Sequence, residues 1–214
     1  MKKIVTLSLL IVASVFTNFS KAQVSQGSVL VDAYYGFPNL YTTVFKTAYA
    51  NSGEEINLKI SGIGPLGIRA EYLISDKIGI GIDAGFNNTN IQYTEQGVNS
   101  VYDSITGLFV DEPYEYDYNF STQKIGVIAT FNYHFVQNDK VDAYAVVGGG
   151  YGSRSFKYET NDPSFEETTI KGVIPVASKI GVGMRYFFTE NIGANFAVGI
   201  GQGGLVNVGL SAKF

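Results

Sequence analysis

The chain has 214 residues, enough for one domain of ordinary size, and its 25 Gly, 15 Tyr and 15 Phe favour β structure. It contains no cysteine, which excludes disulfide bonds, thiolate metal sites and cysteine nucleophiles. The formal net charge is −4, and an acidic chain argues against a nucleic-acid partner.

Residues 1–22 are predicted to be a secretory signal peptide. A short basic start precedes an apolar run over 4–16, and the small residues Ser20 and Ala22 mark a cleavage site. The apolar run is short for a spanning helix, which needs about 20 residues, so an uncleaved anchor is the less favoured alternative. The predicted barrel domain, residues 23–214, keeps 12 basic and 19 acidic residues, because the signal contains three lysines and no acidic residue.

The rest of the chain consists of segments in which apolar and polar residues alternate. Over 78–87, for example, isoleucine, alanine and phenylalanine occupy the even positions, and glycine, aspartate and asparagine occupy the odd ones. This period of two places the two sets on opposite faces of a strand. No window after the signal keeps a helical period, so no helix is predicted there. Eight strands are predicted, each near the ~9–11 residues that a tilted strand needs to cross a bilayer: 29–37, 66–74, 78–87, 124–135, 141–152, 179–188, 192–201 and 206–214.

The predicted connections alternate between short and long. Because successive strands run in opposite directions, the short turns fall at one end of the strands and the long loops at the other. Membrane barrels have this asymmetry, with short turns on the periplasmic side and longer loops outside. The short turns are 75–77, 137–139 and 189–191, the long connections are 38–64, 88–121 and 154–172, and the last connection at the long-loop end, 202–204, is short.

Alternation alone does not say which face points outward, because a soluble lipocalin-like barrel also alternates, with its apolar face inward. Here the polar face is rich in glycine, which suits the crowded interior of an eight-stranded barrel. Aromatic residues at the segment ends suit interfacial girdles. The prediction is an all-β, eight-stranded antiparallel transmembrane β-barrel, an up-and-down meander with its apolar face outward. The aromatic residues at the segment ends are Tyr35, Phe37, Phe86, Tyr133, Phe135, Tyr186 and Phe188.

The last predicted strand resembles the C-terminal sorting signal of outer-membrane proteins. It carries Asn207, then Gly209 two positions later, then Ala212 and the terminal aromatic Phe214. Together with the signal peptide and the meander, residues 27–214 resemble the small outer-membrane β-barrel family, the OmpA, OmpX and OmpW-like group. This resemblance implies a porin-like protein of the Gram-negative cell envelope, located in the outer membrane. It also implies contact with outer-membrane lipid and lipopolysaccharide, and insertion by the barrel-assembly machinery. It carries over no catalytic residue and no cofactor.

The polar faces bring charges of both signs into the predicted lumen. Side chains can fill an eight-stranded interior, so the favoured role of these charges is a structural plug in which they pair. A narrow channel for small solutes, with the charges setting selectivity, is the alternative. A soluble periplasmic ligand-binding barrel is a third reading. The predicted lumen charge cluster contains Arg69, Glu71, Asp83, Lys124, Asp142, Lys179 and Arg185.

The short turns also predict which charges meet. The first turn places Arg69 opposite Asp83, and the second places His134 opposite Asp142, as a polar pair at the periplasmic end. Since His134 is the single histidine, no Ser-His-Asp set and no histidine-based metal site is expected. The chain is therefore predicted not to be an enzyme, and to bind no metal or cofactor.

The second long connection is acidic and contains no lysine or arginine. Its tyrosines alternate with acidic residues over 114–118, which suggests that the strands extend above the membrane as a hairpin. Carboxylates there would suit Ca²⁺, or a divalent bridge to lipopolysaccharide phosphates, although a solvated acidic loop is favoured. The sequence thus predicts a non-catalytic integral outer-membrane protein with a structural or surface-interaction role. The acidic residues are Glu95, Asp103, Asp111, Glu112, Glu115 and Asp117.

Overall fold

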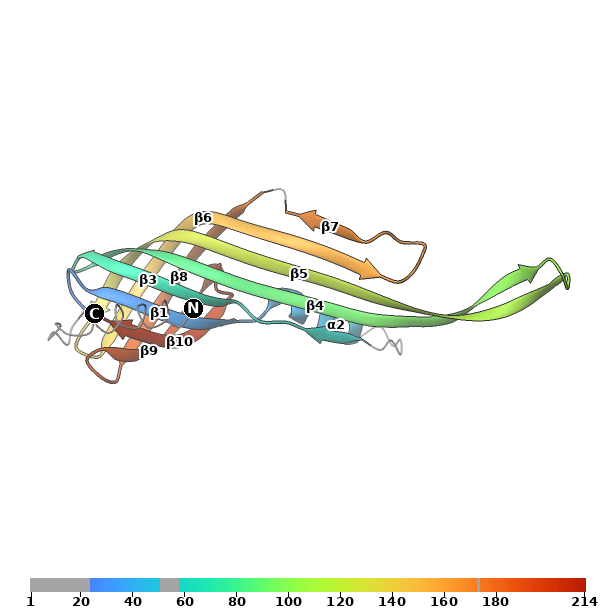
Figure 1. Ribbon diagram of the computed structural model, residues 1–214. Coiled ribbons are helices and arrows are strands. Elements are labelled where there is room, and N and C mark those ends of the chain that lie inside the picture. Colours follow the sequence, from blue (N-terminus) through green and yellow to red (C-terminus); the bar gives the residue numbers. More distant parts are fainter. Residues whose placement is uncertain (1–23, 51–57, 173) are drawn as a thin grey trace, which may run out of the picture.

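The computed structural model describes residues 24–50, 58–172 and 174–214, and the predicted signal peptide lies outside them. Eight long strands form a closed antiparallel barrel (Figure 1), so the predicted fold class is confirmed. The barrel strands are β1 (Val29–Phe37), β3 (Leu66–Ser75), β4 (Ile78–Asp103), β5 (Leu108–Gln137), β6 (Val141–Thr160), β8 (Val176–Phe187), β9 (Ile192–Gly201) and β10 (Val206–Lys213). The other elements are α2 (Leu40–Ala50), β2 (Lys59–Ser61) and β7 (Thr168–Lys171).

The barrel is an up-and-down meander that closes between its first and last strands. Each barrel strand pairs with the next one along the chain, and β10 pairs with β1 over eight residue pairs from Leu30–Lys213 to Phe37–Val206. The seam continues below β10, because the backbones of Val29 and Phe214 exchange hydrogen bonds of 2.9 and 2.8 Å. Closure satisfies every barrel strand on both sides, which removes the exposed edges that an open sheet would present to lipid.

The outward face of the barrel is apolar, as predicted. Ile82 and Ile180 are 59% and 62% exposed, while their polar neighbours along the strands point inward. Across the described barrel strands from one aromatic end to the other, no outward position carries a charge. A soluble barrel would have the opposite arrangement, with its apolar residues inside. Six of the seven predicted aromatic end residues are exposed on the outer face: Tyr35, Phe37, Tyr133, Phe135, Tyr186 and Phe188. The seventh, Phe86, is half-buried.

The predicted long loop over 88–121 is mostly strand. β4 and β5 continue past the barrel and stay in register up to Asp103 and Leu108 (Figure 1). β6 stays paired with β5 as far as Tyr118, and beyond that point β4 and β5 form a two-stranded hairpin. Acidic side chains stabilise it across the strands, because Thr94 donates to Asp117 over 2.7 Å and Ser100 donates to Asp111 over 2.6 Å. The suggested hairpin is therefore present, and the two short strands β2 and β7 pair with the extended parts of β4 and β6.

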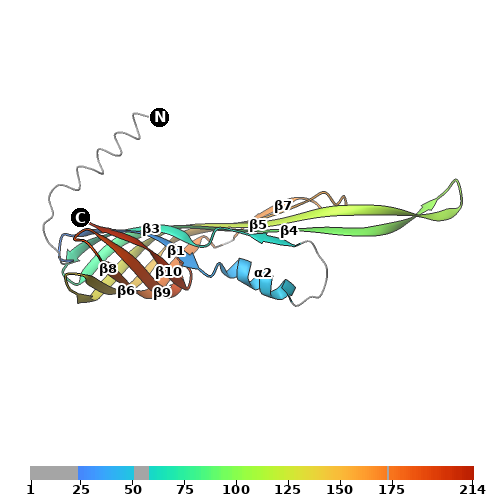
Figure 2. The same cartoon turned by 90° about the horizontal axis from the view of Figure 1, so that it is seen from below.

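The helix α2 is an element that the sequence analysis missed, so the prediction of no helix after the signal is wrong. Its start is fixed by Asn39, whose side chain accepts from the Thr42 backbone N–H at 3.5 Å and also donates to the Asn88 carbonyl oxygen at 2.9 Å. Figure 2 shows α2 beyond the end of the barrel, beside the extension of β4. Of the described helical residues, none belongs to a helix that is both long and apolar enough to cross a membrane.

Candidate functional site

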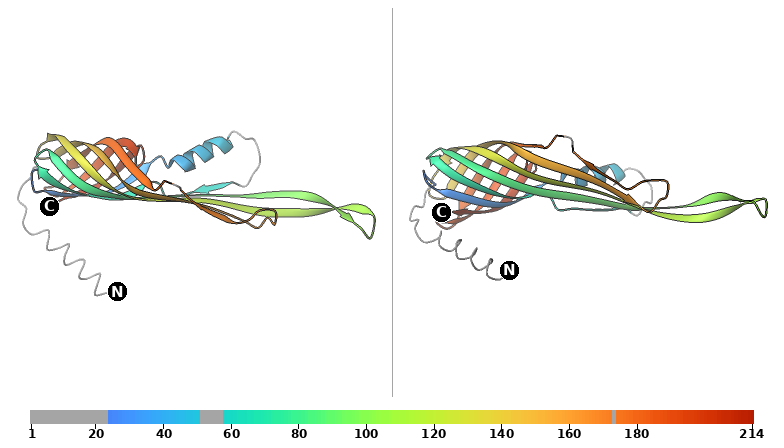
Figure 3. Two further views of the ribbon diagram at one scale, coloured as in Figure 1. Left: turned by 90° about the horizontal axis from the view of Figure 1, so that it is seen from above. Right: turned by 45° about the horizontal axis from the view of Figure 1, so that its top comes forward.

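The interior of the barrel is filled in layers. At the end where the short turns lie, Val24, Leu30, Leu73 and Phe187 form a small buried apolar cluster. Above it lies a buried polar cluster, here called the lumen network. The hairpin and α2 leave the opposite end (Figure 3). The lumen network consists of Asp32, Arg69, Glu71, Asp83, His134, Asp142, Lys179 and Arg185, together with the hydrogen-bonded Tyr34, Tyr144, Gln202 and Ser211.

Arg185, on β8, is the centre of the lower part of the network. Its Nε donates to Asp32 at 2.9 Å, its Nη1 to Asp142 at 2.8 Å, and its Nη2 to both Asp32 and Glu71 at 2.8 and 2.7 Å. Its guanidinium also lies over the Tyr144 ring, 4.4 Å from the ring centre. One fully buried cation thus joins carboxylates from three other strands, which is the pairing that a buried charge requires.

His134 joins two of the same carboxylates from the other side. Its Nδ1 lies 2.6 Å from Asp142 and its Nε2 lies 2.7 Å from Glu71, and all three side chains are fully buried. A ring with a carboxylate at each nitrogen donates at both only when it is doubly protonated. In that form the network balances four carboxylates with four cations.

The contact between His134 and Asp142 was expected, but the register predicted for it is wrong. The structure pairs His134 with Tyr144 and shifts the register between His134 and Val136. The reversal is tight, because the Asn138 N–H donates to the Val141 carbonyl oxygen, and the extra residue in β5 forms a bulge. The two side chains still share the inward face as diagonal neighbours, so the imidazole reaches the carboxylate.

The upper part of the network is built around Asp83. The predicted register is correct here: Arg69 pairs with Asp83, and its Nε lies 3.5 Å from the carboxylate. Lys179 and the Tyr34 hydroxyl donate to the same carboxylate at 2.7 and 2.6 Å. Gln202, from the turn before β10, adds bonds of 3.0 Å to the carboxylate and 2.7 Å to the backbone carbonyl oxygen.

Glycines on the inward face make room for these large side chains. A Cβ at Gly183 would collide with the Tyr144 ring, and one at Gly79 would collide with the Glu71 carboxylate. The glycine-rich polar face of the sequence therefore reflects the filling of the lumen.

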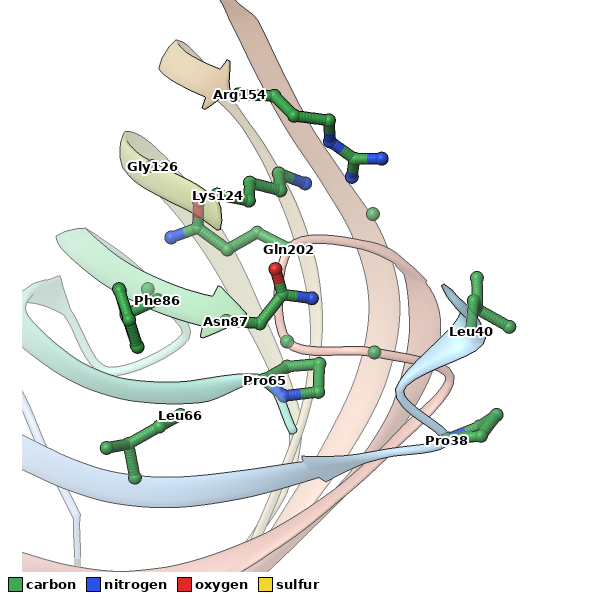
Figure 4. A pocket seen from close by; sticks show the side chains of 14 residues that line it. Pro38, Leu40, Pro65, Leu66, Phe86, Asn87, Lys124, Gly126, Arg154 and Gln202 are labelled. Atoms are coloured by element: carbon green, nitrogen blue, oxygen red, sulfur yellow. The ribbon is translucent and has the colours of Figure 1, made fainter. Parts of the chain in front are cut away.

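Lys124 is the member of the predicted cluster that the structure leaves outside the network. It is half-buried, one level above Gln202, at the end of the barrel where the hairpin begins. There it lines a cavity of about 110 Å³ together with Arg154, Asn87 and Gln202, here called the mouth pocket (Figure 4). Lys124 is separated from the lower charges because Gly126 and Ile128 occupy the inward positions between it and Thr130.

Several central residues of the lumen network lie outside the predicted charge cluster. Asp32 and Tyr34 stood on the polar face of the first strand, and that alternation was the signal that could have included them. Tyr144 was obscured because Val146 and Val147 follow it, and the faces of that segment were unclear. Gln202 belongs to a connection, where no alternation exists to show that its side chain turns into the barrel.

The residues of the predicted sorting signal lie along the closing strand. Asn207 and Gly209 point inward, and Gly209 pairs with Tyr34 across the seam. Ala212 and Phe214 stand on the outward face at the short-turn end. Their role in sorting stays a prediction.

Comparisons with known proteins give likenesses of structure only. No protein-family model matches the chain, and no curated protein matches it in sequence. Among solved structures it is similar to the N-terminal β-barrel domain of OprF from Pseudomonas aeruginosa, with 17% identity, a TM-score of 0.43, and coverage of 89% of this chain and 99% of that one. It is also similar to Ail, the attachment invasion locus protein of Yersinia pestis, with 11% identity, a TM-score of 0.39, and coverage of 88% and 99%.

These TM-scores are below 0.5, so the fold assignment rests on this chain's own strand pairing. Eight antiparallel strands close into a barrel, the outer face is apolar and uncharged along the described strands, and the polar residues are inside. This is the architecture of the small eight-stranded outer-membrane barrels that the sequence resembles.

Proposed function

We propose that the chain is a non-catalytic integral protein of the outer membrane that presents the β4–β5 hairpin outside the cell as a surface-interaction element. The observation that carries this proposal is the uncharged outer belt with aromatic ends, combined with a long extension at one end of the barrel only. Membrane barrels place short turns in the periplasm and long loops outside, which orients the hairpin toward the exterior.

The filled lumen favours a closed barrel, and not a channel. Arg69 and Arg185 are almost completely buried and span the middle of the interior, and the apolar cluster with Leu73 and Phe187 lies below them. A conduit would need water along its whole length, whereas these side chains are buried from solvent at several successive levels. The small-solute channel is therefore the less favoured function.

The position of the single histidine supports a structural role for it. His134 uses both ring nitrogens on buried carboxylates, so neither nitrogen is available to activate a nucleophile or to bind a metal. Among the described residues no group of three or more His, Asp or Glu side chains has the geometry of a metal site.

The tip of the hairpin supports a surface interaction. Ile105 is 93% exposed, and Leu108 and Phe109 beside it are also largely exposed. Solvent-exposed apolar side chains at the end of an otherwise acidic hairpin are typical of contact surfaces. The carboxylates of Asp103 and Asp117 already accept hydrogen bonds within the hairpin, which favours the solvated reading of the acidic segment over Ca²⁺.

Two further partners follow from membrane insertion. Outer-membrane lipid and lipopolysaccharide would surround the apolar belt, and the barrel-assembly machinery would recognise the closing strand β10. Both are part of the proposal.

Cysteine labelling on intact cells tests the location and the orientation. The chain has no native cysteine, so Ser104→Cys in the hairpin turn and Glu190→Cys in a short turn each add a single exposed thiol. A membrane-impermeant maleimide is expected to label the first variant on intact cells and the second only after lysis. Labelling of Glu190→Cys alone on intact cells would contradict the proposed orientation, and labelling of neither after lysis of the membrane fraction would contradict surface exposure.

Conductance in planar bilayers tests the closed lumen. The refolded mature protein is expected to add no steady conductance at neutral pH. Discrete single-channel steps that scale with the number of inserted molecules would establish the channel function in its place.

A further inference from the structure

The mouth pocket is built from one row of residues across three neighbouring strands. Asn87 on β4 pairs with Lys124 on β5, and Lys124 pairs with Arg154 on β6. Figure 4 shows the Lys124 and Arg154 side chains extending together toward the pocket, with the Gln202 amide beside them. Polar groups from three strands and from the turn between β9 and β10 therefore converge where the interior of the barrel opens to the outside.

The row directly beneath consists of glycines, which create the space of the pocket. Gly85 pairs with Gly126, and Gly126 pairs with Gly152. The side chain of Gln202 crosses over this row, so a Cβ at Gly126 would collide with its Oε1. The cavity above is about 110 Å³. Since a water molecule takes about 30 Å³ of liquid volume, this space fits one small group of a few heavy atoms.

The described residues that line the mouth pocket include two cations, whereas the network below contains charges of both signs. Arg69, Lys179 and Arg185 each contact a buried carboxylate. Lys124 forms no ion pair with any carboxylate of the described residues, and no acidic side chain is among the described residues that line the pocket. Two neighbouring cations in a partly enclosed space attract a small anion.

Gln202 adds a requirement that selects among anions. The residue is 5% exposed, and its Nε2 donates twice to Asp83, which fixes the orientation of the amide. Its Oε1 is buried, has no hydrogen-bond partner among the described residues, and lies against Gly126 at the floor of the pocket. A buried acceptor without a partner is costly, and a ligand with an O–H donor would satisfy it.

We propose that the mouth pocket binds a phosphate group. Its negatively charged oxygens would accept from Lys124 and Arg154, the Asn87 amide would complete the row, and the remaining P–O–H would donate to Gln202 Oε1. A phosphate that carries one proton presents both kinds of group at once, whereas a sulfate or an ionised carboxylate has no hydrogen to donate. The phosphate can be free in solution or attached to lipopolysaccharide, and the chemistry of the pocket is the same for both.

Calorimetric titration of the detergent-refolded protein with inorganic phosphate at constant ionic strength tests this proposal. Wild-type protein is expected to bind saturably, and Lys124→Gln is expected to weaken binding about tenfold or more, as expected for the loss of one charge-assisted hydrogen bond. Sulfate is expected to bind at least several-fold more weakly than phosphate. A retained heat-modifiable gel shift shows that each variant is folded.

Lys157→Gln is the matched control. It removes the same charge from the same extracellular end, but Lys157 is exposed, pairs with Glu159 and does not line the pocket. Its phosphate binding is expected to stay within twofold of wild type. Equal weakening by Lys124→Gln and Lys157→Gln would overturn the proposal, because binding would then depend on the net charge alone.

A second titration with lipopolysaccharide micelles distinguishes the two sources. Saturable binding of inorganic phosphate supports a free ligand. Binding seen only with lipopolysaccharide, lost in Lys124→Gln and lost after enzymatic dephosphorylation of the lipid, supports a lipid-borne phosphate. Absence of saturable binding in both titrations overturns the site, and it leaves the proposed surface function unaffected because that function rests on the hairpin and the outer belt.

Discussion

At the scale of residues, the interior depends on mutual satisfaction of charges. Removing water from a charged side chain costs several kcal/mol, so burial is tolerated only when partners replace the water. Arg185 illustrates this, because all of its donor nitrogens face carboxylates and its flat face covers Tyr144. The whole network is therefore expected to fail when one central member is removed.

Arg185→Met tests that dependence. The substitution keeps an elongated side chain but leaves Asp32, Glu71 and Asp142 without their shared cation, and it is expected to lower the free energy of unfolding by about 3–5 kcal/mol. Urea titration in detergent, read by gel mobility, measures the loss. Lys157→Met, at an exposed ion pair, is the control and should change stability little. Equal stability of wild type and Arg185→Met would show that the network is dispensable.

Asp162 gives a residue-scale prediction outside the membrane. The Ser164 backbone N–H and the Tyr118 hydroxyl each donate to its carboxylate over 2.8 Å, and these bonds hold its pKa below the usual 3.8 although partial burial opposes them. A lowered pKa means that the loop contact is fully stabilising above pH 3.8 and is lost as the pH falls through the folded-state pKa. Carbon NMR of labelled aspartate, assigned with Asp162→Asn, measures the midpoint. A midpoint at or above 3.8 would contradict the prediction.

At the scale of elements, strands were predictable where one face meets lipid and the other meets the interior. Ile78, Ile80 and Ile82 alternate with small or polar residues because their environments alternate. Above the membrane both faces meet water, so the apolar–polar alternation does not continue beyond Asn87. Only the alternation of tyrosines with acidic residues over 114–118 suggested the hairpin, and cross-strand bonds such as Thr94–Asp117 stabilise it. The helix α2 is short, and its capping residue Asn39 is the main local signal for it.

The contacts of the candidate site likewise divide into those that local sequence pattern predicts and those that it does not. The pairing of Arg69 with Asp83 was predictable because a tight turn fixes the register of two adjacent strands. The pairing of Arg185 with Asp32 was not, because it crosses the lumen between strands far apart in the sequence. The mouth pocket was also beyond sequence reasoning, since it needs the Gln202 turn to fold into the barrel.

The hairpin is expected to be independent of the barrel. Replacing residues 96–115 with an Asn-Gly turn removes the distal part of β4 and β5 but leaves all barrel pairing between 78–87 and 124–133 intact. The shortened protein should therefore refold with the same thermal midpoint as wild type, read by circular dichroism in detergent. A midpoint lowered by more than a few degrees would show that the hairpin contributes to barrel stability.

At the scale of the whole molecule, the distribution of polar and apolar side chains is the reverse of that in a soluble protein. Within the barrel, the polar and charged side chains lie in the lumen, and the apolar side chains form the outer surface. Such a surface is stable only against lipid or detergent, so membrane insertion is what this distribution of residues requires. The closed hydrogen-bonded ladder and the lumen network hold together a chain that has no disulfide.

Heat-modifiability of the mature protein in detergent tests this central claim most directly. The folded barrel is expected to resist the detergent of the gel and to migrate as a compact fast band, which shifts to the mobility of the unfolded chain after boiling. A protein that stays soluble without detergent and migrates identically before and after boiling would contradict the account, because its apolar faces would then have to point inward.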